Sequence, residues 1–143
     1  MSGDGEQYIN VESIQIHPNY QPGSATLWAN DYSLLKLVSP VTIPAPFLGL
    51  ACLPPDVNQT FAASSLITSG WGHIQGGGPL SPELKAATLV GISNTECQSI
   101  FGPAIVNSHI CASGIPTNAT CQGDSGGKLF TLVGLYIDFM FRP

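Results

Sequence analysis

Charged side chains are scarce in this chain of 143 residues. Asp, Glu, Lys and Arg together make up 9% of the sequence, whereas roughly 25% is typical of a soluble domain. Four residues are Lys or Arg, and the formal net charge is −5. No basic patch is visible, so neither nucleic acid nor an anionic membrane is expected as a partner.

Long apolar runs and metal-binding clusters are also missing. No apolar stretch is long enough to span a bilayer, and no signal peptide precedes Ser2. The three histidines, His17, His73 and His109, do not have the spacing of a ligand cluster. The run Gly76-Gly77-Gly78-Pro79 is not followed by the Lys-Ser/Thr of a phosphate-binding loop, and it is predicted to be a surface loop. The sequence therefore predicts no metal and no cofactor.

What the chain does contain is a series of short apolar segments between turn signals, which predicts an all-β fold with one short helix. The Pro-rich segment 39–55 is predicted to be an extended linker. The spacing of Ser93 and Glu96 is that of a capping box, so a helix is expected to run to about Phe101, before Gly102-Pro103. Strands are expected over residues 8–16, 33–38, 66–69, 86–92, 109–112 and 128–137, the first half-buried and the second buried.

The segment Cys121-Gln122-Gly123-Asp124-Ser125-Gly126-Gly127 places a serine in a glycine-rich turn. A nucleophilic serine needs backbone N–H groups aimed at the oxyanion that forms when its hydroxyl attacks a carbonyl. Gly123 and Ser125 can each supply one, and glycines let a substrate come close to the backbone. The turn fits acyl-transfer chemistry with Ser125 as the nucleophile, but a short Gly/Ser turn alone does not establish it.

Further segments follow one order along the chain: Asn30-Asp31-Tyr32-Ser33-Leu34-Leu35-Lys36-Leu37, Thr68-Ser69-Gly70-Trp71-Gly72, Leu80-Ser81-Pro82-Glu83-Leu84, His109-Ile110-Cys111-Ala112 and Leu132-Val133-Gly134. Together with the serine turn, they resemble the chymotrypsin/trypsin family of serine endopeptidases. The resemblance implies an incomplete two-barrel trypsin-like fold. Residues 1–50 would be a remnant of the N-terminal barrel with the linker, and residues 51–143 a truncated C-terminal barrel.

The chain also departs from the family pattern. It has no Thr-Ala-Ala-His-Cys-like string, which carries the family's general base, and no Ile-Val-Gly-Gly-like start. Residues 1–10 resemble the middle of the first barrel, so we expect the chain to begin downstream of its base. None of the three histidines matches the catalytic string. A common family bridge would need cysteines at Leu66 and Thr131, and both are absent.

By resemblance, two carboxylates have catalytic or activating roles. Asp31 is implied to be the triad aspartate, which orients the histidine and stabilises its charged form. Asp124 is implied to pair with the amino terminus released by zymogen cleavage. Because an unpaired buried carboxylate is costly, Asp124 is expected to turn to solvent here and to leave the Gly123 N–H misplaced, as in an inactive precursor.

The resemblance also indicates a substrate pocket. Ala119 stands six residues before Ser125, where trypsin-like members carry Asp, and Gln122 is expected at the rim. A methyl group cannot compensate a buried cation, so an apolar or small cleavage-site preference is expected. Asn58 and Asn118 both begin glycosylation sequons. Only Asn58 is expected to be used, because Asn118 adjoins the pocket floor.

Four cysteines allow three complete pairings. The resemblance implies one bridge, Cys97 to Cys111, and gives Cys52 and Cys121 no partner within the chain.

Two functions remain open. The first, which we favour, is a partial chain of a secreted serine endopeptidase acting on protein and peptide substrates. It would be inactive alone and would need its missing N-terminal segment as a partner. The second is a short, noncatalytic homologue that acts as a binding or regulatory module.

Overall fold

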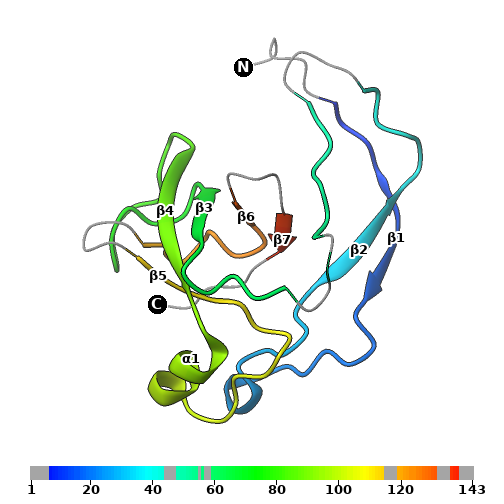
Figure 1. Ribbon diagram of the computed structural model, residues 1–143. Helices are drawn as coiled ribbons and strands as arrows, with labels where there is room; N and C mark the ends of the chain where they lie inside the picture. Colours follow the sequence, from blue (N-terminus) through cyan, green and yellow to red (C-terminus); the bar gives the residue numbers. More distant parts are fainter. Residues whose placement is uncertain are drawn as a thin grey trace.

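The computed structural model describes residues 7–43, 48–54, 56, 59–114, 119–131 and 136–138 (Figure 1). In these residues the chain forms two antiparallel sheets, a short α-helix and a 3-10 turn, η1 (Ser24–Thr26). The smaller sheet pairs β1 (Val11–Ile16) with β2 (Ser33–Leu37), and Figure 1 shows it to one side of the larger sheet. The larger sheet has the order β5-β4-β3-β6-β7. Its strands are β3 (Ser65–Gly70), β4 (Lys85–Ile92), β5 (Cys111–Gly114), β6 (Lys128–Thr131) and β7 (Tyr136–Asp138).

The core of the larger sheet is formed by leucines from three adjacent strands. Leu66 on β3, Leu89 on β4 and Leu129 on β6 are each 1% exposed, and Phe61 packs with them. Leu66 lies opposite Leu89 on one side and opposite Thr131 on the other. Burying a leucine completely contributes roughly 1.5–3 kcal/mol, so these side chains hold β3, β4 and β6 together. Leu66 and Thr131 are also the two positions at which the family's second common bridge would need cysteines, and here they are neighbours on paired strands.

The small sheet corrects the expected burial of the first two strands. Both form, but β1 is exposed along its whole length and β2 along most of it. Ile14 lies opposite Leu35, and the two side chains are 63% and 57% exposed. The apolar pattern correctly predicted the strands, but burial also requires a covering element, and no described residue covers this face.

The last predicted strand is wrong in its extent. A single strand was expected over residues 128–137, whereas β6 and β7 are two antiparallel strands with Leu129 opposite Ile137. Residues 132–135, between them, lie outside the described residues. A continuous apolar run cannot show where the chain reverses direction. The predicted linker 39–55 is described at 39–43 and 48–54, where it contains no named strand or helix.

The predicted helix is confirmed as α1 (Asn94–Phe101). The Ser93 hydroxyl accepts the Glu96 N–H at 3.1 Å, and the Gly102 N–H donates to the Gln98 carbonyl at 2.8 Å. Gly102 has φ +83°, a backbone angle that glycine adopts without the steric cost that a Cβ would bring. Both ends of the helix are therefore determined by local residues.

Candidate active site

The turn that carries Ser125 leads directly into β6. The Asp124 N–H donates to the Cys121 carbonyl at 3.1 Å, and the Gly127 N–H donates to the Asp124 carbonyl at 2.9 Å. Gly123 and Gly126 have φ +96° and +79°. These left-handed conformations disfavour any residue with a Cβ. The two glycines therefore shape a turn in which Ser125 is exposed.

The Asp124 carboxylate anchors this turn to a second segment. Its Oδ1 accepts the Gly72 N–H at 2.8 Å, and its Oδ2 accepts the Cys121 N–H at 2.9 Å. An added Cβ at Gly70 or Gly72 would overlap the same carboxylate. The Gly70-Trp71-Gly72 sequence thus makes room for Asp124, a role that sequence analysis did not identify.

The expectation that Asp124 turns to solvent is wrong. The residue is half-buried, and each carboxylate oxygen has a backbone donor. Hydrogen bonds from amides to the charged form compensate for burial, so the two backbone donors accommodate the carboxylate. The ion pairs among the described residues are Lys36–Glu12 and Lys85–Glu83, and neither includes Asp124.

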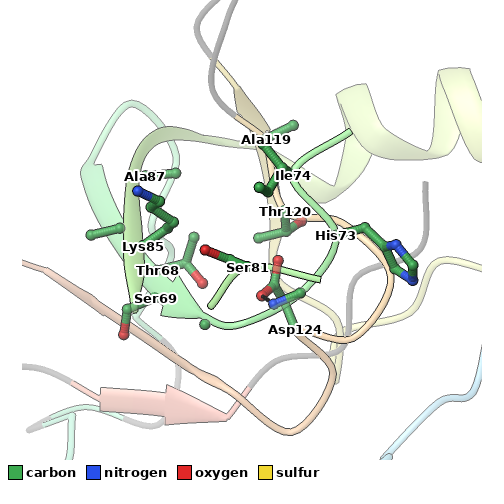
Figure 2. A pocket seen from close by; sticks show the side chains of 13 residues that line it. Thr68, Ser69, His73, Ile74, Ser81, Lys85, Ala87, Ala119, Thr120 and Asp124 are labelled. Atoms are coloured by element: carbon green, nitrogen blue, oxygen red, sulfur yellow. Dashed lines mark hydrogen bonds between the residues drawn. The ribbon is translucent and has the colours of Figure 1, made fainter. Parts of the chain in front are cut away.

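A cavity of about 270 Å³ lies behind the serine turn (Figure 2). Its walls are formed by β3, residues 72–74, Ser81, the start of β4, Ala119, Thr120 and Asp124. Figure 2 shows the Asp124 and Ser81 side chains at the centre of this group, whereas the His73 imidazole points away from the other labelled side chains. The structure therefore brings Ala119 and Asp124 to one cavity. Gln122 and Ser125 are exposed and are not part of its lining.

Asp31 lies on a different segment, immediately before β2. It is half-buried, and desolvation by its surroundings raises the pKa of its carboxyl group. Among the described residues, no hydrogen bond joins Asp31 to Ser125 or to a histidine. Asp31 and Ser125 are thus placed by separate parts of the fold.

Each histidine is hydrogen-bonded within its own surroundings. His17 Nδ1 accepts the Asn19 N–H, His73 Nδ1 bonds to the Gly78 carbonyl, and both ring nitrogens of His109 have backbone partners. In the part of the chain that the structure describes, no imidazole bonds to Ser125. That none of the three histidines is the catalytic base stays a prediction.

The disulfide predicted between Cys97 and Cys111 is confirmed. It lies in a buried cluster with Ile105, beneath α1. Cys52 is exposed and Cys121 half-buried, and both are free thiols. The predicted glycosylation site, Asn58, lies outside the described residues.

The antiparallel β-sheets and the exposed serine between two positive-φ glycines agree with the arrangement that the serine endopeptidase resemblance implied. A family model described as Trypsin matches residues 1–137. The chain therefore belongs to the trypsin family, and the predicted resemblance and fold class are confirmed.

Curated relatives agree with this assignment. The chain is 32% identical over 130 residues to chymotrypsin-like elastase family member 1 of Rattus norvegicus, covering 90% of this chain and 48% of the relative. It is 32% identical over 130 residues to fibrinolytic enzyme, isozyme C, of Lumbricus rubellus, covering 87% and 53%. U21-ctenitoxin-Pn1a of Phoneutria nigriventer is 34% identical over 134 residues, with coverage of 87% and 52%. The chain thus spans about half the length of these curated relatives.

A solved structure supports the fold. Neuropsin, a serine protease of mouse brain, superposes with a TM-score of 0.80 at 26% sequence identity, covering 92% of this chain and 57% of neuropsin. In the described ranges, no helix is long and apolar enough to cross a membrane. The same residues contain no group of three or more His, Cys, Asp and Glu side chains suited to a metal ion.

Proposed function

We infer that this chain carries the nucleophile of a secreted serine endopeptidase that cleaves proteins and peptides through an acyl-enzyme intermediate. One observation carries the inference: Ser125 is exposed in a turn whose two flanking glycines are left-handed and whose Asp124 carboxylate is held by two amides. This is a nucleophile placed on a rigid support, as covalent catalysis requires.

Each residue has a defined role in this proposal. The Ser125 hydroxyl attacks the scissile carbonyl, and the Gly123 and Ser125 N–H groups stabilise the oxyanion. Asp31 orients the imidazole that accepts the serine proton. That imidazole comes from outside the three histidines of this chain. Removing the corresponding histidine in subtilisin lowers kcat by about 2 × 10⁶-fold, so the chain alone is proposed to be inactive.

The cavity behind the turn supports an activating role for Asp124. Its lining contains the carboxylate, whose two oxygens already face inward toward Gly72 and Cys121. An amino terminus entering this cavity would add a cation to the two amides. We propose that such pairing fixes the serine turn in its active shape.

Ala119 supports a preference for apolar or small side chains at the cleavage site. It is uncharged and lines the cavity that also contains Asp124. A basic substrate side chain would find no countercharge from this residue.

The second candidate is a noncatalytic homologue that binds a partner. It is favoured by the engagement of all three imidazoles with groups other than Ser125. In that case the serine turn would be a structural remnant.

Labelling of Ser125 with a fluorophosphonate, with and without added imidazole, separates these two functions. We expect no labelling of the chain alone, and slow labelling that rises with imidazole concentration, because free imidazole replaces the absent base. The Ser125→Ala variant should stay unlabelled throughout. Ser113→Ala, which removes an exposed serine on β5, is the matched control and should label like the parent.

Two outcomes count against the proposal. Labelling of the parent without imidazole, abolished in Ser125→Ala, would refute the predicted inactivity. No labelling at any imidazole concentration, in protein whose circular dichroism shows the folded β structure, would favour the noncatalytic homologue.

A further inference from the structure

His109 connects two segments that are far apart in the sequence. It lies between α1 and β5, and its Nε2 is 2.9 Å from the Leu27 carbonyl oxygen, 82 positions away along the chain. Because a carbonyl oxygen only accepts hydrogen bonds, Nε2 must carry the proton. This half-buried bond therefore attaches the segment before Asp31 to the loop clipped by the Cys97–Cys111 disulfide.

The other ring nitrogen fixes the orientation of the imidazole. His109 Nδ1 accepts the Val106 N–H at 3.0 Å, and the His109 N–H donates to the Val106 carbonyl at 2.9 Å. The ring is thus held in its own loop by Val106 and directs its Nε2–H toward Leu27. Nδ1 thus makes a hydrogen bond within its own loop, whereas Nε2 makes the hydrogen bond to the distant segment.

The segment that receives this bond is conformationally strained. Leu27, Trp28 and Asn30 have φ angles of 45°, 52° and 58°. The left-handed region is sterically unfavourable for side chains such as those of Leu27 and Trp28, so they persist in it only where the surroundings hold them. Leu27 packs against the cluster of Cys97, Ile105 and Cys111.

Two further contacts hold the end of this segment close to Asp31. Ala29 is 3% exposed, and the Asn30 N–H donates to the Ser108 hydroxyl at 3.3 Å. The Asn30 carbonyl then accepts the Tyr32 N–H at 2.9 Å across Asp31. Asp31 therefore follows directly from residues that the 105–109 loop holds in place.

We propose that His109 is a positioning residue: its Nε2–H holds Leu27, Trp28 and Asn30 in their left-handed conformations and thereby fixes the direction of the Asp31 carboxylate. The catalytic meaning of this placement rests on the proposed function, because Asp31 is the orienting carboxylate only in a protease. The placement itself can be measured without any catalysis.

Two substitutions at position 109 separate the local bond from the bond between segments. The His109→Asn side chain can still accept the Val106 N–H through its oxygen, but it is too short to reach Leu27. The His109→Gln side chain is longer and places an N–H donor near the position of Nε2. The matched control is His73→Asn, which changes a histidine in the separate loop 71–80.

The readouts are amide hydrogen exchange at Asn30 and Tyr32, and the carboxyl pKa of Asp31 by carbon-13 NMR. In His109→Asn we expect exchange at both amides to rise roughly threefold to tenfold, as for the loss of one hydrogen bond. The pKa of Asp31 should fall toward its ordinary value, because the carboxylate becomes better hydrated. His109→Gln should restore the values of the parent, and His73→Asn should keep them.

Unchanged exchange and an unchanged Asp31 pKa in His109→Asn would overturn the proposal. A rise in exchange that is equally large in β3 and β4 would also overturn it, because His109 would then support the fold in general. Ser108→Ala provides a second variant: it removes the acceptor of the Asn30 N–H, so it should raise exchange at Asn30 at least as much as His109→Asn and at Tyr32 by a smaller factor. None of these readouts uses Ser125, so failure of the proposed protease function would leave this result unaffected.

Discussion

Asp31 and Asp124 are both half-buried, but their surroundings act differently on the two carboxyl groups. Asp124 is half-buried but has an amide donor for each oxygen. Asp31 is half-buried, and desolvation raises the pKa of its carboxyl group. Hydrogen bonds to the charged form make burial tolerable, whereas desolvation without them favours the neutral form. The Asp124 carboxylate is therefore suited to anchoring a loop, whereas the surroundings of Asp31 favour the neutral form of its carboxyl group.

The Asp31→Asn variant tests this difference. The raised pKa means that Asp31 contributes most favourably below its unfolded pKa, about 3.9, and that this contribution is lost as the pH rises through the folded value. Asn does not titrate, so the variant should melt at a slightly higher temperature than the parent at pH 7. The difference should vanish near pH 3.

Thermal unfolding followed by circular dichroism across this pH range is the measurement. Glu83→Gln, which removes an exposed carboxylate from another loop, controls for the change in net charge. A parent that is more stable than Asp31→Asn at pH 7 would contradict the prediction, because it would show that the ionised Asp31 gains a favourable partner.

The sequence predicted the serine turn well but not the position of Asp124. Gly123, Ser125 and Gly126 are neighbours, so their conformations follow from local sequence. The Asp124 carboxylate is held by Gly72, 52 positions away. A bond of that separation depends on how β3 and β6 pair, which no local pattern reveals.

At the scale of elements, β4 is fixed by a close approach of the backbone. The Gly91 N–H donates to the Ser64 carbonyl at 2.9 Å, and the Gly91 carbonyl accepts the Ala63 N–H at 2.8 Å. A Cβ added at Gly91 would overlap the Phe61 carbonyl oxygen. Glycine is therefore required at this position so that the turn at residues 61–64 can lie against the strand.

Gly91→Ala should lower the free energy of unfolding by about 1–3 kcal/mol, as overpacking of a closely packed site typically does. Urea denaturation measures this change. Gly76→Ala, at a position where a Cβ meets no atom within 4 Å, should change stability by less than about 0.5 kcal/mol. Equal effects of the two variants would show that the Phe61 contact does not limit the site.

Predictions of elements succeeded where the signals were local. Ser93 and Gly102 correctly bounded α1, because capping depends on residues within one turn of the helix. The division of residues 128–137 into β6 and β7 was missed, and so was the exposure of β1 and β2. Both depend on which segments meet in space, and the apolar pattern alone does not contain that information.

At the scale of the whole molecule, the small sheet presents an apolar face to solvent. Ile14, Ile16 and Leu35 alternate onto the same side of the β1–β2 pair, and all three are exposed. The Lys36–Glu12 ion pair joins the same strands and is also exposed. Exposed apolar faces and unpaired strand edges favour association between molecules.

We therefore expect the chain to bind a hydrophobic dye such as ANS in native buffer and to contain little well-folded monomer. Replacing Ile14 and Leu35 together by Thr, which keeps a high β propensity, should lower the dye fluorescence and raise the monomer fraction in size-exclusion chromatography. Gln15→Thr, on the other side of β1, is the control and should change neither. A cooperative unfolding transition of the parent without dye binding would contradict this expectation.

The central place of β3 in the larger sheet has a consequence for the order in which the chain acquires its structure. β3 and β4 follow each other closely and can pair early during synthesis, but the other edge of β3 pairs with β6, which emerges only after residues 71–127 have been made. Contacts between distant segments form slowly because a long loop must close first. The nascent chain thus keeps an unpaired β3 edge until residues 71–127 have been made, and the turn that carries Ser125 reaches its place only when β6 pairs with β3.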